Sequence, residues 1–264
     1  MKLEVLISTL GADGIRRTAA MNLPRMDEVG YLVGWQMPEG EIPEELRRPD
    51  IKILTKEERG LSRNRNMLLD NASAEIVLIA DDDLTYTPER LREVIRVFEE
   101  DASLELATFR YDGADVKSYP AGECELRIPL PKGYYLTSFE MALRRTVGTG
   151  SLRFNEKMGL GAEYIQAGEE EMFLYEAIMS GVKARFFPIT VTRHGGLTTG
   201  NRRLTAGAAR GSGVVIKQYY PFSAPLRILL KAWRLYRADQ YGFFAAVREM
   251  VRGIRYGRKN GIIL

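Results

Sequence analysis

The stretch Glu75-Ile-Val-Leu-Ile-Ala-Asp-Asp-Asp83 decides the fold of this chain. Its five consecutive apolar residues predict a strand that is covered on both faces, as strands of mostly parallel sheets are. Ligands of such sheets bind beyond the carboxyl ends of the strands. Asp81, Asp82 and Asp83 follow this strand directly, so they are placed where a ligand is expected.

The segments around this strand alternate between strand and helix patterns. The expected strands are residues 3–9, 31–36, 51–54 and 75–80, and the expected helices are residues 15–21, 62–70 and 88–100. We expect a glycine-containing turn at residues 11–14 and an N-cap at Ser62. The alternation predicts an α/β doubly wound domain, with a Rossmann-type, mostly parallel sheet flanked by helices.

The second half of the chain has fewer regular signals. Residues 104–165 are typical of strand and loop. The remaining expected elements are a helix over 169–180 that ends at Gly181, a strand over 186–192, a polar, glycine-rich loop over 197–213, and amphipathic helix from Pro225 onward.

Composition excludes several classes of protein. The apolar fraction of 45% and the charged fraction of 28% are those of a globular domain, not of a disordered chain. The single cysteine, Cys124, fits a reducing cytosol. Residues 1–9 are too short and interrupted for a signal peptide, and no apolar run reaches the roughly 18–20 residues that span a bilayer. We therefore expect a cytoplasmic protein.

The aspartate triplet predicts a metal site. Three like charges at the end of a buried strand repel one another unless a cation neutralises them. Oxygen ligands suit Mn²⁺ or Mg²⁺, which commonly bind carboxylates together with phosphate oxygens. An ion held there would stabilise the charge on a diphosphate leaving group. The alternative is a solvated acidic turn that caps the next helix.

Two further segments have a chemical and a structural interpretation. The arginines of Gly60–Asn66 suit phosphate contacts at a helix N-terminus, or the segment is an ordinary surface helix. In Gly168–Phe173, three glutamates either stabilise the first helical turn or supply a general base for a hydroxyl nucleophile.

His194, the only histidine, precedes two glycines and is either structural or a metal ligand beside a carboxylate.

In this order, the motifs resemble those of family 2 glycosyltransferases of the GT-A fold, over roughly residues 3–200. The matching residues are Gly60, Ser62, Arg65 and Asn66, then Asp81 to Asp83, then Gly159, Gly161 and Ala162, then Gly168 to Phe173. The resemblance implies a GT-A-like catalytic domain, which we expect over residues 1–213, followed by a basic helical C-terminal extension over 214–264.

The resemblance also implies roles for individual residues. Asp83 would bind Mn²⁺ or Mg²⁺, with Asp81 and His194 as further ligands. Glu170 would be the general base, with Glu169 as the alternative. The expected donor-binding residues are Thr9, Gln36, Ser62, Arg65, Asn66, Asp81 and Asp82. The chain departs from the family at 34–36, where Gly-Trp-Gln replaces an aspartate-containing stretch, and there Gln36 is expected to bind uracil.

The activity implied is metal-dependent transfer of a sugar, with inversion, from a nucleotide-diphosphate sugar to a glycan or lipid-linked acceptor. The expected donor is UDP-linked, and the expected product is a surface polysaccharide or glycoconjugate. One alternative is a nucleotidyltransferase, although residues 11–17 resemble its phosphate-binding loop only weakly. The other is a non-catalytic subunit that binds sugar nucleotides.

The C-terminal extension is basic, with ten Lys and Arg against two Asp and Glu in residues 214–264. Within 225–237, large apolar residues recur at helical spacing between basic ones: Leu226, Leu229, Leu230, Trp233 and Tyr236. This pattern predicts peripheral contact between residues 225–259 and an anionic membrane at its cytoplasmic face. The alternative is packing on the catalytic domain. The acidic remainder of the chain and the absence of a recognition motif argue against nucleic acid as a partner.

Overall fold

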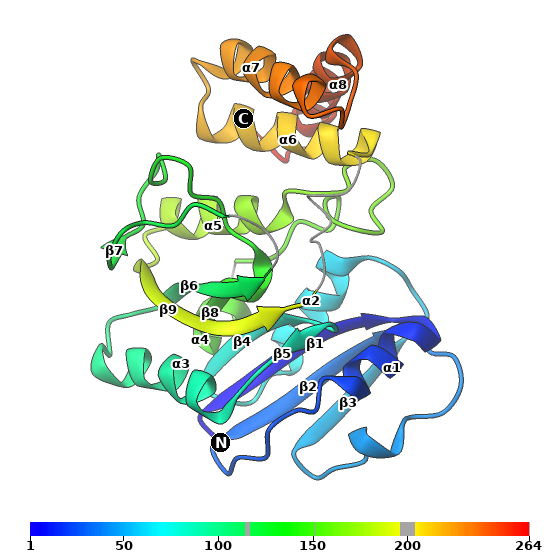
Figure 1. Cartoon of the computed structure of the whole chain (residues 1–264), viewed down its shortest axis with the longest axis vertical. Coiled ribbons are helices and arrows are strands. Elements are labelled where there is room, and N and C mark those ends of the chain that lie inside the picture. Colours follow the sequence, from blue (N-terminus) through cyan, green and yellow to red (C-terminus); the bar gives the residue numbers. More distant parts are fainter. Residues whose placement is uncertain (114–116, 151, 196–203, 264) are drawn as a thin grey trace.

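A mixed sheet runs through the centre of the protein, as the computed structural model shows (Figure 1). The structure describes residues 1–113, 117–150, 152–195 and 204–263. Within these residues the strands are β1 Leu3–Leu10, β2 Val29–Gln36, β3 Ile51–Lys56, β4 Ile76–Asp81, β5 Leu84–Thr85, β6 Leu106–Gly113, β7 Cys124–Glu125, β8 Met141–Arg144 and β9 Ala184–His194. Their order is β3-β2-β1-β4-β8-β6-β9-β5, and β7 pairs with β9.

The first four strands of this order are parallel, so their carboxyl ends lie along one edge. Leu10 of β1 is level with Gln36 of β2, and Ser8 is level with Asp81 of β4. The expected strands of the first half are therefore confirmed. The second half adds β8, which runs antiparallel to both β4 and β6.

Helices cover both faces of the sheet. Those in the described residues are α1 Gly11–Ala20, α2 Leu61–Asn71, α3 Pro88–Glu100, α4 Arg145–Thr149, α5 Glu169–Met179, α6 Ala206–Tyr219, α7 Ala224–Arg237 and α8 Phe243–Lys259, with 3₁₀ turns η1 Glu44–Leu46 and η2 Ser138–Glu140. Apolar residues of α1 and α3 share one core cluster with β1, and those of α2 and α5 share another with β4. The expected α/β class, with a mostly parallel sheet between helices, is confirmed.

Two local expectations near the sheet edge are wrong. The turn expected at residues 11–14 is the first turn of α1, which begins at Gly11 with a φ of 64°. Ser62 does not cap α2, because Gly60 is the capping residue. The Ser62 hydroxyl instead donates to the carbonyl of Met158 at 2.7 Å.

The loop expected over residues 197–213 is helical from Ala206 onward, while residues 197–203 lie outside the described residues. Thr205 caps this helix by accepting from the Ala208 backbone N–H at 3.1 Å. The glycines that suggested a loop allow close packing instead. A Cβ on Gly211 would come within 2.3 Å of the Ala167 carbonyl oxygen, and one on Gly213 within 2.2 Å of the Met250 carbonyl oxygen.

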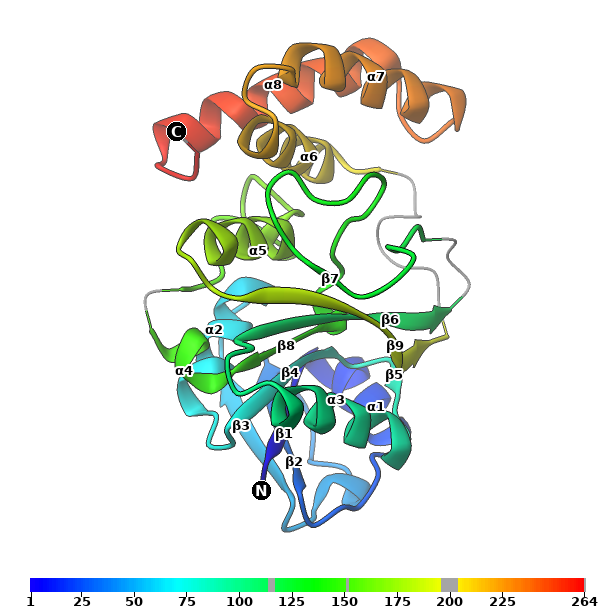
Figure 2. The same ribbon diagram turned by 90° about the vertical axis from the view of Figure 1, so that its left-hand side faces the viewer.

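Helices α6, α7 and α8 form a layer at the end of the molecule opposite β3 (Figure 2). The helical character expected from Pro225 onward is confirmed. Helix α6 crosses residue 213, and the division of the chain at that residue stays a prediction. No helix in the described residues is long and apolar enough to cross a membrane.

Candidate active site

Strand β5 brings the aspartates and the histidine together. It follows Asp83 directly and pairs with the end of β9, where Leu84 lies opposite His194. His194 Nε2 consequently lies 3.2 Å from Asp83 Oδ2, although the two residues are 111 positions apart. The imidazole stacks on the Phe139 ring at 5.5 Å between centroids. Its Nδ1 is buried and has no hydrogen-bond partner among the described residues.

Asp82 points away from this pair and toward α1. The Thr9 hydroxyl donates to Asp82 Oδ2 at 2.6 Å, and Arg17 donates to both carboxylate oxygens, at 3.0 and 2.9 Å. Helix α1 approaches closely here, because a Cβ on Gly14 would lie 2.3 Å from the Thr9 hydroxyl oxygen. Asp82 is thus neutralised by the chain itself, unlike Asp83.

Arg65 joins the strand edge to α5. Its side chain is 2% exposed, and its guanidinium donates to Asp81 at 3.1 Å and to Glu169 at 3.0 Å. It also donates to the Ser138 hydroxyl at 2.6 Å and lies over the Phe154 ring. Burial raises the pKa of Asp81 above its usual range, and the Arg65 charge opposes that rise.

Ser62 and Asn66 of the Gly60–Asn66 motif, and Gln36 of β2, form hydrogen bonds with backbone groups of the protein itself. Ser62 contacts Met158, and the Asn66 amide donates to the carbonyl of Phe154 at 3.0 Å and accepts from its N–H at 3.0 Å. Gln36 donates to the carbonyl of Gly60 at 3.1 Å. All three side chains are buried. The contacts of Ser62 and Asn66 fix α2 against the loop that follows α4, and the Gln36 contact fixes the start of α2 against the end of β2.

Gly159 and Gly161 of that loop are required by close packing. Both have positive φ values, 95° and 85°, which favour glycine. A Cβ on Gly159 would lie 2.9 Å from the carboxyl carbon of Glu169, and one on Gly161 would lie 3.0 Å from the Gly60 nitrogen. The G-x-G segment therefore presses the start of α2 and the first turn of α5 together.

The three glutamates at the start of α5 differ in their contacts. Glu169 pairs with Arg65, whereas Glu170 Oε2 is buried without a hydrogen-bond partner in the described part of the chain. Burial raises the pKa of Glu170 well above its usual range, and the charges of Glu169 and Glu171 raise it further. Burial, with the charge of Glu169, raises the pKa of Glu171 to about 7. A carboxylate that is buried, unpaired and reluctant to lose its proton is a good proton acceptor once ionised.

A divalent ion fits the Asp83–His194 pair. A carboxylate oxygen and an imidazole nitrogen at 3.2 Å suit Mn²⁺ or Mg²⁺ when phosphate oxygens complete the coordination. Across the described residues, no group of three or more His, Cys, Asp and Glu is placed to hold a metal ion. Asp83 Oδ2 and His194 Nε2 are two adjacent groups of ligand type, and Asp81 lies on the same strand end.

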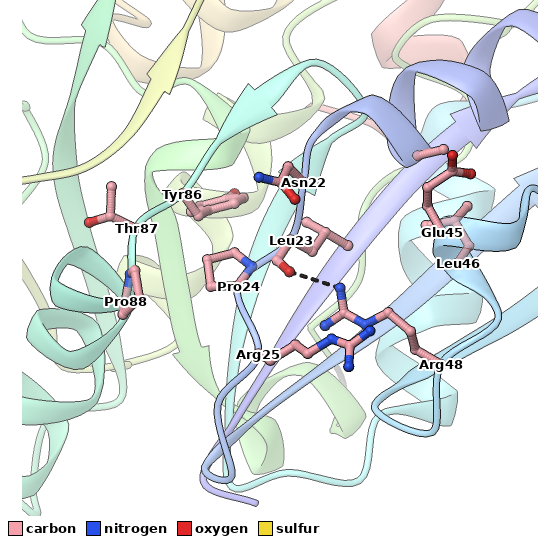
Figure 3. Close-up of a pocket in the computed structure, with 11 residues that line it drawn as sticks. Asn22, Leu23, Pro24, Arg25, Glu45, Leu46, Arg48, Tyr86, Thr87 and Pro88 are labelled. Carbon is pink, nitrogen blue, oxygen red and sulfur yellow. Dashed lines mark hydrogen bonds between the residues drawn. The ribbon is translucent and has the colours of Figure 1, made fainter.

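A separate pocket of about 600 Å³ opens between the end of α1, η1 and the start of α3 (Figure 3). Arg48 crosses it and donates to the Leu23 carbonyl at 2.8 Å. None of the residues expected to bind donor or metal, or to act as the general base, lines it. Its lining residues are Ala19, Asn22, Leu23, Pro24, Arg25, Glu45, Leu46, Arg48, Tyr86, Thr87 and Pro88.

Sequence reasoning missed two residues that hold the site. Arg17 neutralises Asp82, and Ser138 of η2 accepts from Arg65. The run of two arginines, Arg16 and Arg17, just beyond the first strand was a usable signal, because α1 starts at the same sheet edge as the aspartates. Nothing in the sequence around Ser138 marks it.

Comparison with known proteins agrees with the resemblance. Residues 40–159 match the model of the family described as Glycosyl transferase family 2. This range contains the Gly60–Asn66 motif and the aspartates, and it ends before Glu169 and His194. The search of curated proteins gives no match.

Solved structures show the fold. The first 349 residues of S. aureus TarS in complex with UDP-GlcNAc have 16% identity and a TM-score of 0.62, with 92% of this chain and 74% of that one covered. The complex with UDP has 16% identity and a TM-score of 0.60, covering 91% and 72%. A further structure of S. aureus TarS has 16% identity and a TM-score of 0.59, with 92% of this chain and 44% of that one covered. The chain has the GT-A-like fold.

Proposed function

We propose that the chain transfers a sugar from a UDP-linked donor to a hydroxyl of a glycan or lipid-linked acceptor, in a metal-dependent reaction with inversion. The observation that carries the proposal is the Arg65 bridge between Asp81 and Glu169. It connects the strand end that is expected to meet the donor with the helix that carries Glu170. The family match and the UDP-GlcNAc and UDP complexes of TarS support the same class of donor.

Glu170 is the proposed general base. Its unpaired oxygen accepts the proton of the acceptor hydroxyl while the hydroxyl oxygen forms a bond to the anomeric carbon. The bond from that carbon to the diphosphate breaks, and its electron pair leaves with UDP. Attack on the face opposite the leaving group inverts the anomeric centre. Glu169 remains the alternative, but its pairing with Arg65 makes it the weaker proton acceptor.

Asp83 and His194 are the proposed holders of Mn²⁺ or Mg²⁺, with Asp81 beside them. When bound, such an ion supplies positive charge to the diphosphate leaving group. The pairing of Leu84 with His194 supports this assignment, because it brings Asp83, directly before β5, beside the end of β9.

The donor is proposed to lie along the carboxyl ends of β1, β2 and β4. Gln36 and Asp81 end β2 and β4, Asp82 follows β4 directly, and Thr9 is the last residue but one of β1. The remaining expected donor residues, Ser62, Arg65 and Asn66, border this edge from α2, and their contacts with the chain shape it.

We infer synthesis of a surface polysaccharide or glycoconjugate in the cytoplasm, with residues 225–259 in peripheral contact with an anionic membrane. The basic, amphipathic helices α7 and α8 support this location.

A thermal-shift screen of nucleoside diphosphates, with and without Mn²⁺, tests donor binding. Ligand at about 100 times its Kd stabilises a protein by about 2.7 kcal/mol, which raises the melting temperature. We expect a response to UDP that grows with Mn²⁺, followed by release of UDP from a UDP-sugar when acceptors are supplied. Failure of every nucleotide to shift the melting temperature would refute the proposal.

Assays of product release with the same protein distinguish a glycosyltransferase from a nucleotidyltransferase and from a non-catalytic subunit. A nucleotidyltransferase would release pyrophosphate from a nucleoside triphosphate and a sugar phosphate. A non-catalytic subunit would bind UDP-sugars and release no UDP with any acceptor.

A further inference from the structure

Helix α7 has two apolar faces, and only one of them is packed. Its inner face joins α8 in a buried cluster through Ile228, Ala232 and Leu235. Packing on the protein explains one such face only. The second face is exposed to 46–61% at each large side chain, namely Leu226, Leu229, Leu230, Trp233 and Tyr236.

The exposed face continues onto the start of α8. Phe244 is 85% exposed, and the rings of Trp233, Tyr236, Phe243 and Phe244 border a hollow of about 340 Å³. Both views place α7 and α8 in the outermost layer of the molecule, beyond α6 (Figures 1 and 2). The helices that carry this face therefore lie at one end of the molecule, away from the sheet.

Basic residues lie along the exposed apolar face. The exposed cations of α7 are Arg227, Lys231, Arg234 and Arg237, and those of α8 are Arg248, Arg252, Arg255, Arg258 and Lys259. Only two acidic residues occur between positions 214 and 264. One of them, Glu249, is 3% exposed and pairs with Arg210 and Arg252. The layer is thus apolar and cationic together.

We propose that the outer face of α7, with Phe244, docks on an anionic phospholipid bilayer and lies in the plane of the interface. Leucines and aromatic rings bury among the headgroups and upper acyl chains, and Lys and Arg bind the anionic headgroups. A second copy of the chain is a poorer occupant, because two such faces would bring like charges together. An anionic bilayer supplies acyl chains for the apolar side chains and negative headgroups for the cations.

The docking layer is fixed to the candidate active site. The Tyr219 hydroxyl of α6 donates to the backbone carbonyl of Glu171 at 2.6 Å, one residue from Glu170. On the proposed function, on which this step rests, docking would hold α5 at a set distance from the bilayer. A lipid-linked acceptor is the substrate class that such an arrangement suits.

Co-sedimentation with vesicles tests the docking without donor or acceptor. We expect binding to phosphatidylcholine vesicles that contain phosphatidylglycerol, weaker binding at high salt, and little binding to phosphatidylcholine alone. Brominated lipids should quench the fluorescence of Trp233 and spare that of Trp35, which is 2% exposed. The Trp233→Phe variant should bind and lose the quenching, which places the face at the bilayer even if larger changes harm the fold.

Variants of the exposed face should then separate apolar from ionic contributions. The double variant Leu229→Ser/Trp233→Ser should bind vesicles about tenfold less tightly or worse. Arg234→Gln and Arg237→Gln should each weaken binding about fivefold. Met179→Ser and Arg92→Gln, which alter exposed side chains of α5 and α3, are the matched controls and should bind normally.

Three results would overturn the proposal. The wild-type protein does not bind the anionic vesicles, or the double variant binds them as well as wild type while it retains its melting temperature. In the third, light scattering shows a wild-type dimer that the double variant converts to a monomer, and neither binds vesicles. That result would assign the face to a second copy.

Discussion

Arg65 on α2 and Glu169 on α5 form an ion pair at 3.0 Å in which the side chains are only 2% and 6% exposed. The two residues are 104 positions apart. The same guanidinium donates to Asp81 at 3.1 Å, so one buried cation serves two carboxylates. The pair therefore fixes the first turn of α5 relative to the end of β4.

Replacing Arg65 should destabilise the protein strongly. The Arg65→Met variant leaves Glu169 buried without a cation, which costs about 3–5 kcal/mol. Arg65→Lys should recover only part of this, because an ammonium lacks the planar fork that reaches both carboxylates. Urea denaturation measures the loss, with the exposed Arg92→Met as the control. Equal urea midpoints for Arg65→Met and wild type would show that the buried pair contributes nothing.

Replacing Glu170 should abolish most turnover and leave the fold intact. Loss of a general base typically lowers the rate by about 100–10,000-fold, which is the effect expected of Glu170→Gln on UDP release. Since burial raises the pKa of Glu170, the wild-type rate should climb with pH as the carboxyl group ionises and then level off. A full rate in Glu170→Gln, or a larger loss in a folded Glu169→Gln, would assign the base elsewhere.

Glu171 should make the protein less stable as the pH rises. Its pKa is about 7 in the folded state and near the usual 4.5 in the unfolded chain. Between these values the folded state binds more protons, so stability is lost as pH rises through the window. Glu171→Gln should melt like wild type at pH 4 and higher at pH 8, by roughly 2–4 °C for each kcal/mol gained. Calorimetry at both pH values measures this, with exposed Glu163→Gln as the control; a constant difference between the pH values would contradict it.

The strand pattern was predictable from the sequence because its signals are local. The run before Asp81 is apolar on both faces, and β4 is buried on both faces. The helix from Pro88 to Glu100 also has the expected bounds, since a proline in its first turn marks its start. These elements place the aspartates at the sheet edge without knowledge of the tertiary structure.

The contacts across the site were not predictable in the same way. The approach of His194 to Asp83 depends on the pairing of the two-residue strand β5 with β9, which no local pattern indicates. The position of Ser62 at the start of its helix predicts a cap, but its hydroxyl donates to the carbonyl of Met158 in a loop that is distant in the sequence. The glycines of α6 suggested a loop because their packing partners lie far away in the sequence.

Arg17 should stabilise the protein by neutralising Asp82. It donates to both oxygens of a carboxylate that is 12% exposed, so Arg17→Gln should cost about 1–2 kcal/mol. The neighbouring Arg16→Gln is the matched control, because Arg16 is 68% exposed and pairs with Asp13 at 3.5 Å. Urea midpoints compare the two variants. A similar loss in both would mean that the Asp82 contact is no stronger than a surface pair.

Asp83 and His194 should account for the part of UDP binding that depends on metal. Asp83→Asn and His194→Gln each remove one of the two adjacent ligand groups, so affinity for Mn²⁺ should fall by at least about tenfold. In thermal-shift measurements, the increment that Mn²⁺ adds to the UDP response should be largely lost. The response to UDP alone should remain, because the nucleoside contacts are unchanged. Asp13→Asn, at a side chain that is 85% exposed, is the control and should retain the full increment. An undiminished Mn²⁺ increment in both Asp83→Asn and His194→Gln would place the ion elsewhere, with Asp81 as the next residue to replace.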